Sequence, residues 1–392
     1  MAHSLPALLD RLRPGLEEAV AEIAHTWRPA DPAYRADVYR QILMNLAYAY
    51  FVYFHADPEH PDWSPLWNPV FTMQPNPDDI YLYCPIRGDL RYRISGPRGT
   101  VKMVTFTVQR GFCGLVDSVA EMGEFADLDD RALHLTPEGE IDLLLAAERP
   151  ADWSGDWLRL PPTADTLVVR LRAYDWENEV DPNLAIQCLD PVPPKPRLAP
   201  AEIERRIREL ARFPARMARL FYGMQNAIRE AVGVNVFQPA PIEGALSRQI
   251  YLPAAFELSP GEALLLETDL PRRCHYWNFQ LNDPYFNACE YVYRFASLNG
   301  HQAHISSDGR FRAVIALEDP GAPNWLDPGG FTEGTVYGRW YDASDCPTPS
   351  LRRIPLAEVW EWLPPDTPRV SPKERAEQLA RRVRAAQRRR RW

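Results

Sequence analysis

Residues 335–342 read Thr-Val-Tyr-Gly-Arg-Trp-Tyr-Asp, and residues 168–175 read Val-Val-Arg-Leu-Arg-Ala-Tyr-Asp. Side chains two residues apart point to the same side of a β-strand. One face of the later stretch therefore carries Thr335, Tyr337, Arg339 and Tyr341, and one face of the earlier stretch carries Val168, Arg170, Arg172 and Tyr174. Both stretches end in Arg-x-Tyr-Asp, which indicates that one strand is present twice.

Further landmarks recur in the same order before these two stretches. They are the tripeptides Ile80-Tyr81-Leu82 and Ile250-Tyr251-Leu252, the aromatic-rich runs 101–108 and 275–281, the turn glycines Gly139 and Gly309, and the pairs Trp157-Leu158 and Trp325-Leu326. The spacing is also similar, since 15 residues separate Trp157 from Arg172 and 14 separate Trp325 from Arg339. We therefore predict a duplicated antiparallel β-sandwich, jelly-roll-like, in a mainly β chain with added helices (α+β).

Helical periodicity marks the segments that flank the two copies. We expect an N-terminal helical segment over 1–62, the first sandwich over 63–192, a proline-rich linker and helix over 193–235, the second sandwich over 236–368, and a basic helical tail over 369–392. The connector Pro191–Pro200 contains Pro-Val-Pro-Pro-Lys-Pro, which is a stiff sequence. The 39 prolines among 392 residues favour many short strands joined by fixed turns.

The sequence predicts a cytoplasmic protein. Its N-terminus lacks a basic start followed by an apolar run, and its most apolar stretch, 42–54, is too short to span a bilayer. The six cysteines are scattered without a Cys-x-x-Cys pair, as expected for reduced thiols. Oligomeric state is left open by these features.

Charge is distributed unevenly along the chain. The net charge is −9, but residues 373–391 hold nine Lys/Arg and two Glu, a net of +7, so the remainder carries −9 − 7 = −16. An acidic body disfavours nucleic acid as the main partner. The tail opens with the capping box Ser371-Pro-Lys-Glu374. We expect it to be a solvated, frayed helix; the alternative is docking to an acidic surface, either an anionic membrane or the protein's own body.

Three residues are candidates for catalysis. Asp78 lies in the polar cluster Asn76-Pro-Asp-Asp79 and could act as a general acid or base if a pocket buries it. Arg339 and Tyr341 share a strand face and could hold a developing oxyanion. The structural alternatives are a capped turn at Asp78 and an arginine tied to backbone carbonyls or to an acid.

Candidate substrate-binding residues surround these three. They are polar or aromatic side chains on the same predicted strands and turns: Asn76, Tyr81, Tyr276, Trp277, Asn278 and Trp325. The indole rings could form apolar walls, while the amides orient a ligand. The structural alternative is that most of these rings belong to the core.

No cofactor is expected. The run His55-Ala-Asp57-Pro-Glu59-His60 supplies four possible metal ligands, but it ends a helix and no distal histidine completes it. The chain also lacks His-Glu-x-x-His, Gly-x-Ser-x-Gly, a phosphate-binding loop and a dinucleotide glycine fingerprint. We therefore predict neither a metal nor an organic cofactor.

Two parts of the chain resemble a bacterial family, that of the domain of unknown function 1214. The segment 76–81, followed by Tyr92-Arg-Ile-Ser-Gly96, is similar to its N-terminal signature, and residues 267–342 look like the domain itself, through Tyr276-Trp277, Asp308-Gly309, Asp319-Pro320, Asn324-Trp325-Leu326 and Arg339. The resemblance implies a two-part β-sandwich, often found beside the related domain 1254, of which no typical copy is evident here. It implies no reaction, and the basic tail lies outside it.

Three functions fit the sequence. The first is a cofactor-independent enzyme that moves a proton on a small hydrophobic or aromatic metabolite, steroid- or terpenoid-like, as an isomerase, lyase or hydratase. The second is a carbohydrate-processing or carbohydrate-binding tandem sandwich, which requires Trp277 or Trp325 to be accessible. The third is a non-catalytic scaffold that uses the aromatic N-terminal helix and the basic tail as contact surfaces.

Overall fold

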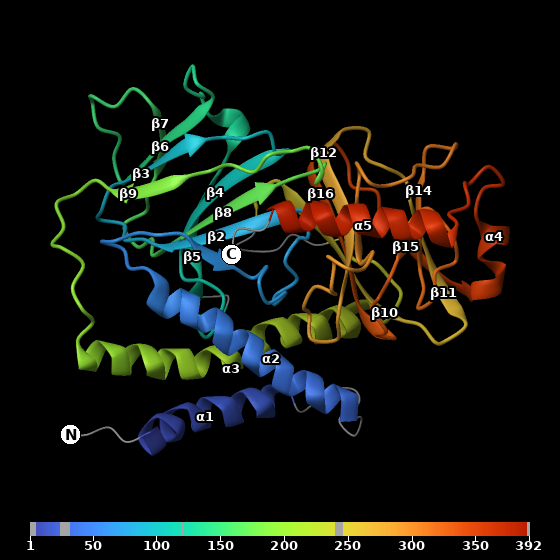
Figure 1. Ribbon diagram of the computed structural model, residues 1–392, viewed down its shortest axis with the longest axis horizontal. Helices are drawn as coiled ribbons and strands as arrows, with labels where there is room; N and C mark the ends of the chain where they lie inside the picture. The colour runs from blue at the N-terminus through green and yellow to red at the C-terminus, as the bar shows by residue number, and fades with distance from the viewer. Residues whose placement is uncertain (1–4, 24–31, 119–120, 240–245, 390–392) are drawn as a thin grey trace.

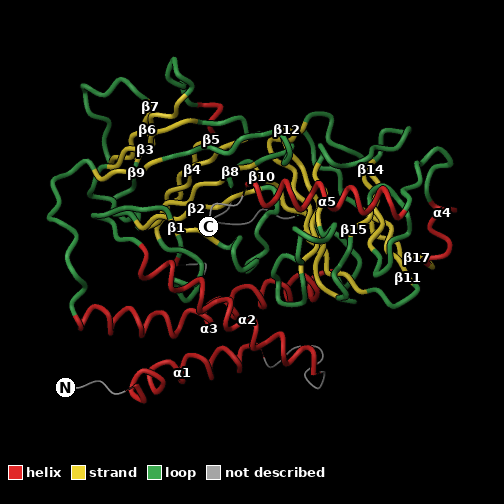
Figure 2. Tube along the Cα trace, in the orientation of Figure 1, coloured by secondary structure: helices red, strands yellow, loops and turns green. Residues whose placement is uncertain are grey.

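The strands form four sheets that stack in two pairs, and helices pack along one side of both pairs (Figures 1 and 2). The structure is a computed structural model and describes residues 5–23, 32–118, 121–239 and 246–389. Within those ranges, no helix combines the length and the apolar character that a membrane crossing needs. The predicted class, a mainly β chain with added helices, is confirmed.

The first sandwich pairs a five-stranded sheet, in the order β1-β2-β8-β4-β5, with a four-stranded sheet, in the order β7-β6-β3-β9. Its strands are β1 (Ser64–Leu66), β2 (Asp79–Pro85), β3 (Tyr92–Pro97), β4 (Met103–Arg110), β5 (Gly123–Asp129), β6 (Glu140–Ala146), β7 (Asp156–Arg159), β8 (Thr166–Arg172) and β9 (Ala185–Cys188). All pairs are antiparallel except β6 with β7, which run parallel.

The second sandwich repeats this topology. Its sheets have the orders β10-β16-β12-β13 and β15-β14-β11-β17. Its strands are β10 (Gln249–Glu257), β11 (Glu262–Thr268), β12 (Cys274–Asn282), β13 (Ser297–Asn299), β14 (Phe311–Ile315), β15 (Trp325–Leu326), β16 (Glu333–Ala343) and β17 (Ser350–Pro355). Each of β2–β9 corresponds to the strand eight places later, and the parallel pair recurs as β14 with β15. The predicted duplication is therefore confirmed.

Local details of the two copies also agree. Gly139 and Gly309 lie in the turns that precede β6 and β14, with φ of 80° and 81°, a conformation that disfavours any side chain. The indole Nε1 of Trp157 donates to the Ala146 carbonyl at 3.0 Å, and that of Trp325 donates to the Ala316 carbonyl at 2.9 Å.

Strand register corrects one part of the predicted repeat. Tyr81 lies opposite Arg170 in the β2–β8 pair, whereas its counterpart Tyr251 lies opposite Arg339 in the β10–β16 pair. Both guanidinium groups sit 5.8 Å from the facing tyrosine ring. In the structure, Arg339 is therefore equivalent to Arg170 and not to Arg172. The sequence alignment of the two Arg-x-Tyr-Asp motifs is shifted by two residues from the structural alignment. A shift of two residues leaves each side chain on the same face of its strand.

Each sandwich buries apolar side chains between its two sheets, and one sheet of each sandwich directs its other face toward the second sandwich. Phe106 of β4 and Phe279 of β12 lie inside their own sandwiches, fully buried. On the opposite faces, Arg172 of β8 places its guanidinium 4.2 Å from the ring centre of Tyr276 on β12 and donates to Gln249 of β10 at 2.9 Å. The two sheets β1-β2-β8-β4-β5 and β10-β16-β12-β13 therefore meet through a layer that contains buried polar groups.

Three N-terminal and linker helices close one edge of this layer. They are α1 (Leu5–Ile23), α2 (Pro32–Tyr50), which runs into the π-helical turn η1 (Phe51–His55), and α3 (Pro200–Val232). Tyr48 of α2 and Phe213 of α3 pack in one apolar cluster with Tyr81 and Tyr337 from the two sheets. Shorter pieces lie elsewhere: η3 (Asp130–Ala132), η4 (Leu356–Glu358) and α4 (Val359–Trp362).

The basic C-terminal helix α5 (Pro372–Arg389) lies across both sandwiches (Figure 1). Arg375, Arg382 and Arg389 recur every seven residues and are each 7% exposed. Arg375 binds Asp319 of the second sandwich at 2.8 Å, and Arg389 binds Asp181 of the first at 3.0 Å. The predicted frayed terminus is therefore wrong for residues 372–389: the helix docks on the protein's own acidic body, because the heptad spacing aims three arginines at one groove.

Substitution of Ala385 tests how firmly α5 is docked. Ala385 is 3% exposed, so Ala385→Glu buries an unpaired carboxylate and should release the helix at a cost of about 2–4 kcal/mol. Trypsin should then cleave within α5 at least tenfold faster than in the wild type. Ala380→Glu places the same charge on the exposed side of this helix and should leave cleavage unchanged; equal rates for the two variants would contradict the docking.

A buried carboxyl group lies where α2 meets the second sandwich. Asp283 is 4% exposed and accepts hydrogen bonds from the backbone N–H groups of Tyr285 and Asn287, while the Asn287 amide also donates to Gln41 of α2 at 2.6 Å. Burial raises the pKa of Asp283 to about 6 in spite of these hydrogen bonds.

This raised pKa predicts a specific pH dependence of stability. The folded state holds the Asp283 proton more tightly than the unfolded chain, so this group's contribution to stability falls as the pH rises from about 4 to about 6. Over that interval the free energy of unfolding of the wild type should fall by roughly 2–3 kcal/mol relative to Asp283→Asn. Urea titrations of both proteins at pH 4, 5, 6 and 7 measure the difference, and a pH-independent difference would be the contrary result.

Candidate functional site

The centre of the interface between the sandwiches is a fully buried ion pair. Arg172 and Asp79 are each 1% exposed, and the guanidinium Nε and Nη2 donate to the two carboxylate oxygens at 2.6 and 2.7 Å. Burial alone would raise the pKa of Asp79, but the Arg172 charge and hydrogen bonds lower it. Paired in this way, the two groups remain charged inside the protein.

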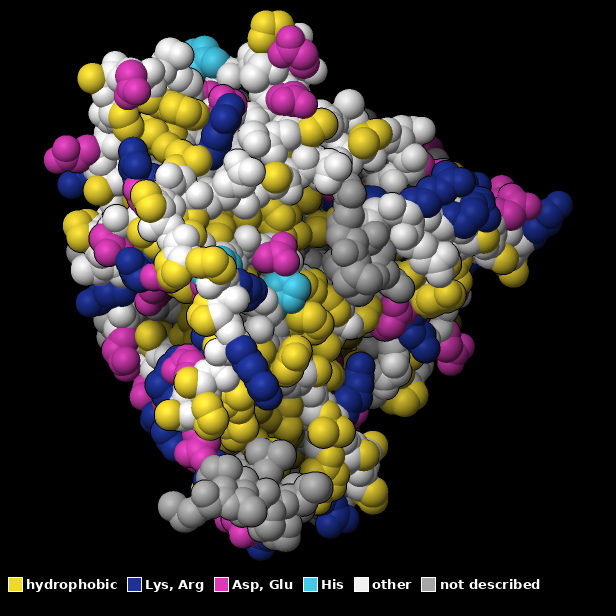
Figure 3. Space-filling view, turned by 60° about the vertical axis from the view of Figure 1, so that its left-hand side comes forward, with side chains coloured by type: hydrophobic (Ala, Val, Ile, Leu, Met, Phe, Trp, Pro, Cys, Tyr) yellow, Lys and Arg dark blue, Asp and Glu magenta, His cyan; other side chains and the backbone are white. Residues whose placement is uncertain are grey.

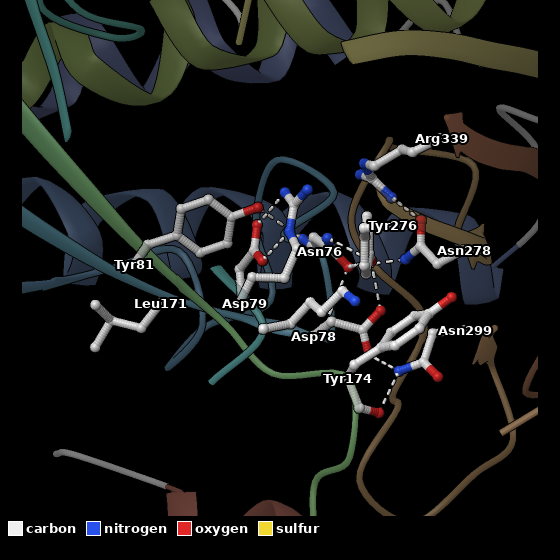
Figure 4. A network of polar contacts seen from close by, with 12 residues as sticks. Asn76, Asp78, Asp79, Tyr81, Leu171, Tyr174, Tyr276, Asn278, Asn299 and Arg339 are labelled. Atoms are coloured by element: carbon white, nitrogen blue, oxygen red, sulfur yellow. Dashed lines mark hydrogen bonds and ion pairs between the residues drawn. The ribbon is translucent and has the colours of Figure 1, made fainter. Parts of the chain in front are cut away.

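Asp78 lies beside this pair and connects both sandwiches (Figure 4). Its Oδ2 accepts a hydrogen bond from the Tyr276 hydroxyl at 2.5 Å, and its Oδ1 accepts from Trp176 Nε1 and Asn299 Nδ2, both at 2.7 Å. Burial raises the pKa of Asp78, and the three hydrogen bonds oppose that rise. Both oxygens are engaged, so the carboxyl group serves as a junction of three segments.

Asn76 completes the junction. Its side chain donates to the Tyr276 hydroxyl at 2.9 Å and accepts from Asn278 at 2.8 Å, while its backbone N–H donates to the Tyr81 hydroxyl at 3.0 Å (Figure 4). Five predicted site residues are thus brought together from two sandwiches: Asn76, Asp78, Tyr81, Tyr276 and Asn278. All of them are buried.

Arg339 extends this network on the side of the helices. It is 3% exposed, and it donates to the uncharged oxygens of Asn278 at 3.3 Å, Gln280 at 2.6 Å and Gln74 at 3.0 Å. Tyr341 lies further along β16 and donates to Asp129 at 2.7 Å. Burial would raise the pKa of Asp129, but hydrogen bonds from Arg131 and Tyr341 hold it at about 2.

Two predicted site residues lie apart from the network. Trp277 is 7% exposed and packs inside the second sandwich, with its ring centre 5.0 Å from that of Phe311. Trp325 is half-buried on β15, next to Phe295. The alternation along β12 accounts for Trp277, since its neighbours Tyr276 and Asn278 occupy the opposite face.

In the run of possible metal ligands 55–60, which follows α2, the ring nitrogens of His60 contact other protein groups. His60 Nδ1 lies 3.0 Å from Asp57, and its Nε2 lies 2.8 Å from the Pro193 carbonyl. In the part of the chain that the structure describes, no group of three or more His, Cys, Asp or Glu side chains is arranged to hold a metal ion.

A cavity of about 380 Å³ opens next to the Asp78 junction, under α5; we call it the α5 cavity. Its wall joins the first sandwich (Asp175, Trp176), the second sandwich (Phe295, His301, Ala303) and the helix (Arg381, Arg382). Asn299 links it to Asp78, because this side chain donates to Asp78 while its Oδ1 accepts the backbone N–H of His301 at 3.0 Å. Asp78 therefore fixes two walls of the cavity, one through Trp176 and one through the turn that carries His301.

The α5 cavity contains a histidine beside a carboxylate. His301 Nε2 lies 3.6 Å from Asp175 Oδ2, and half of the histidine side chain is exposed. Burial would raise the pKa of Asp175, but hydrogen bonds from Asn178 and from backbone N–H groups, together with His301, lower it. Such a carboxylate can orient an imidazole and stabilise its charged form.

Sequence reasoning did not identify these cavity residues. Asp175 ends the Arg-x-Tyr-Asp repeat, but His301 lies more than a hundred residues later in the chain, so the sequence does not reveal their contact. Trp176 directly follows the Arg-x-Tyr-Asp repeat, and this position is the sequence feature that could have pointed to the cavity wall. Two further cavities, of about 200 and 370 Å³, lie against Asp79 and against Tyr341.

Comparisons with known proteins confirm the predicted resemblance over part of the chain. The sequence profile of the family "Protein of unknown function (DUF1214)" matches residues 84–178, in the first sandwich, and so includes 92–96, whereas the stretches 76–81 and 267–342 lie outside this match. An uncharacterized protein from Burkholderia cenocepacia has a similar crystal structure, with 27% identity and a TM-score of 0.83 over 90% of this chain and 97% of that one. A protein from Vibrio parahaemolyticus is 15% identical over 86% of this chain and 100% of that one, with a TM-score of 0.46. No curated protein sequence matches significantly.

Two substitutions of Asp78 separate its acceptor role from its charge. Asp78→Ala leaves three buried donors without an acceptor and should lower the free energy of unfolding by about 3–5 kcal/mol. In Asp78→Asn the amide oxygen still accepts from Trp176 and Asn299, and its NH₂ can donate to the Tyr276 hydroxyl, so the loss should stay below about 2 kcal/mol. Urea unfolding measures both, and equal losses would show that the junction does not depend on hydrogen bonding.

Proposed function

We propose that this protein is an enzyme that transfers a proton on a small hydrophobic or aromatic molecule bound in the α5 cavity. The observation that carries the proposal is the cavity's position: about 380 Å³ of space where both sandwiches and α5 meet, with the His301–Asp175 pair in its wall. Cavities at the junction of separately folded units are typical of small-molecule binding, and the wall of this one combines aromatic side chains with charged and amide groups. The reaction class is that of an isomerase, lyase or hydratase.

In this proposal His301 is the general acid or base. Its exposed imidazole can reach a bound molecule, and an imidazole can both accept and donate a proton through its ring nitrogens. Asp175 orients the ring and stabilises the imidazolium that forms when the proton is taken up. The same pair then returns the proton to another atom of the substrate, as an isomerisation requires, or to the leaving group of an elimination.

The other walls support an apolar ligand that carries an anionic group. Phe295 and Trp176 supply aromatic surface. The Arg382 guanidinium lies 4.6 Å from the Trp176 ring, and its hydrogen bonds go to uncharged oxygens of Tyr291 and Ser297. Burial lowers the pKa of Arg382 to about 10, which leaves it charged at neutral pH. A carboxylate on the ligand would compensate this buried cation.

The proposal changes the roles of the catalytic candidates. Asp78 becomes a positioning residue, since its oxygens are engaged by Trp176, Asn299 and Tyr276. Arg339 and Tyr341 lie outside the wall of the α5 cavity, so they are not needed to hold an oxyanion there.

The carbohydrate alternative has less support. It requires Trp277 or Trp325 to be accessible, whereas Trp277 is 7% exposed within the core and Trp325 is half-buried, with the Arg375 guanidinium 5.5 Å from its ring. A cytoplasmic location remains part of the proposal. It is supported by the six cysteines, all of which are free thiols.

Filling the cavity tests whether it binds ligands. Ala303→Trp should weaken the binding of 2-naphthoate, an aromatic carboxylate used as the probe, by more than tenfold in isothermal titration calorimetry, because the indole occupies the probe's space. Ala132→Trp makes the same change in the wall of the 370 Å³ cavity and should leave binding within twofold of the wild type. Native mass spectrometry of the freshly purified full chain should detect a small molecule that Ala303→Trp no longer retains.

His301→Asn tests the chemistry. This variant should lower turnover of the retained compound by about a hundredfold or more, because general acid–base catalysis contributes that much, while 2-naphthoate binding stays within threefold. His134→Asn alters a more exposed histidine that also lies beside an aspartate, Asp156, but outside the wall of the cavity, and it should leave turnover unchanged. Full activity in His301→Asn would remove this residue from the mechanism, and a protein that binds neither probe nor metabolite would refute the site.

A further inference from the structure

The outer side of α2 presents an apolar face to solvent, although its other side is already packed on the protein. Tyr39, Leu43 and Tyr50 are 62%, 65% and 57% exposed, and Ala36, before Tyr39, and Ala47, between Leu43 and Tyr50, are exposed as well. At 100° per residue these five side chains form one stripe along the helix, the α2 stripe. Figure 3 shows hydrophobic side chains across the lower part of the surface, where Figure 1 places the N-terminal helices.

The buried side of the same helix packs against α1 and α3. Tyr34, Val38 and Ile42 pack with α1 and α3, and Tyr48 packs with Phe213 of α3. A helix that is apolar on both sides is typical of one that is covered on both sides. The α2 stripe therefore requires a partner surface to explain its composition.

The positions of the stripe are symmetric about Leu43, and each large side chain on one side corresponds to a small one on the other. Tyr39 and Ala47 lie four residues on either side of Leu43, and Ala36 and Tyr50 lie seven residues on either side. If a second α2 lies antiparallel with a two-fold axis at Leu43, then Tyr39 faces Ala47 of the other copy and Ala36 faces its Tyr50. Every large side chain then meets a small one, and the two leucines meet at the axis, which is the complementarity that close helix packing needs.

We infer that the α2 stripe is the interface of a homodimer, formed by antiparallel pairing of α2 with α2 of a second copy around Leu43. A two-fold interface must be self-complementary, and the alternation of large and small side chains meets that condition within one helix. The spacing of three, four and seven residues is also that of an antiparallel two-helix seam. This inference does not depend on the proposed reaction, because α2 contributes nothing to the wall of the α5 cavity.

A second copy fits the stripe better than a lipid surface does. Helices that lie on anionic membranes carry many Lys and Arg along the flanks of the apolar face. Within α2, Arg35 and Arg40 supply the positive charge, and the whole chain, including the docked basic helix α5, carries a net −9. An anionic bilayer would repel this body.

Light scattering after size-exclusion chromatography tests the inference on the full chain. The molar mass of the wild type, measured by light scattering, should be twice the chain mass of 44.9 kDa. Leu43→Arg places two cations at the axis and should shift the protein to a monomer, with the dissociation constant raised at least a hundredfold. Leu135→Arg alters a leucine that is 43% exposed in the first sandwich and should remain dimeric. Circular dichroism and thermal unfolding confirm that both variants are folded.

The antiparallel register has its own test. Ala47→Tyr sets tyrosine against Tyr39 of the other copy and should weaken the dimer at least tenfold, whereas the double variant Tyr39→Ala, Ala47→Tyr restores one large and one small side chain at that contact and should recover dimerisation. A monomeric wild type, or a dimer unaffected by Leu43→Arg, overturns the interface. A monomer that floats with phosphatidylglycerol vesicles would assign the stripe to a membrane, and failure of the double variant to recover would refute this register.

Discussion

The buried charges between the sandwiches are the constraint on which the rest of the structure depends. Asp78, Asp79 and Arg172 are each at most 2% exposed, so their charges and hydrogen-bonding groups must be satisfied by protein. Asp79 and Arg172 satisfy one another within the first sandwich, but Asp78 is satisfied by Tyr276 and Asn299 of the second. Directional hydrogen bonds of this kind tolerate little displacement, so they hold the two sandwiches in one relative position.

That position creates the α5 cavity. Trp176 and the turn carrying His301 come from different sandwiches, and both are held through Asp78. Helix α5 closes the space because its buried arginines find acceptors on both sides of the groove, Asp319 in the second sandwich and Asp181 in the first. The stability of the interface and the geometry of the proposed reaction site therefore rest on the same carboxyl group.

Much of the fold was predictable because it depends on local patterns. Alternating residues, turn glycines and the repeated order of landmarks predicted the two sandwiches, and seven-residue spacing was present in the tail. The structural alignment of the two copies was not predictable from the sequence. The Arg-x-Tyr-Asp motifs align Arg172 with Arg339, whereas the strand pairing makes Arg170 the equivalent of Arg339. The docking of the tail was also mispredicted, because the acceptors of its arginines lie in distant segments.

For the site, the sequence by itself determined which faces of the strands carry polar residues, and so it identified Asn76, Asp78, Tyr276, Asn278 and Arg339. Tertiary structure decided what these residues do. Whether a carboxyl group is free for chemistry or engaged depends on donors supplied by other segments, and Trp176, Tyr276 and Asn299 reach Asp78 from 98 to 221 residues away. The contact of His301 with Asp175 arises in the same way, because the two residues come from different sandwiches. No local sequence pattern indicates which surfaces of the two sandwiches are in contact.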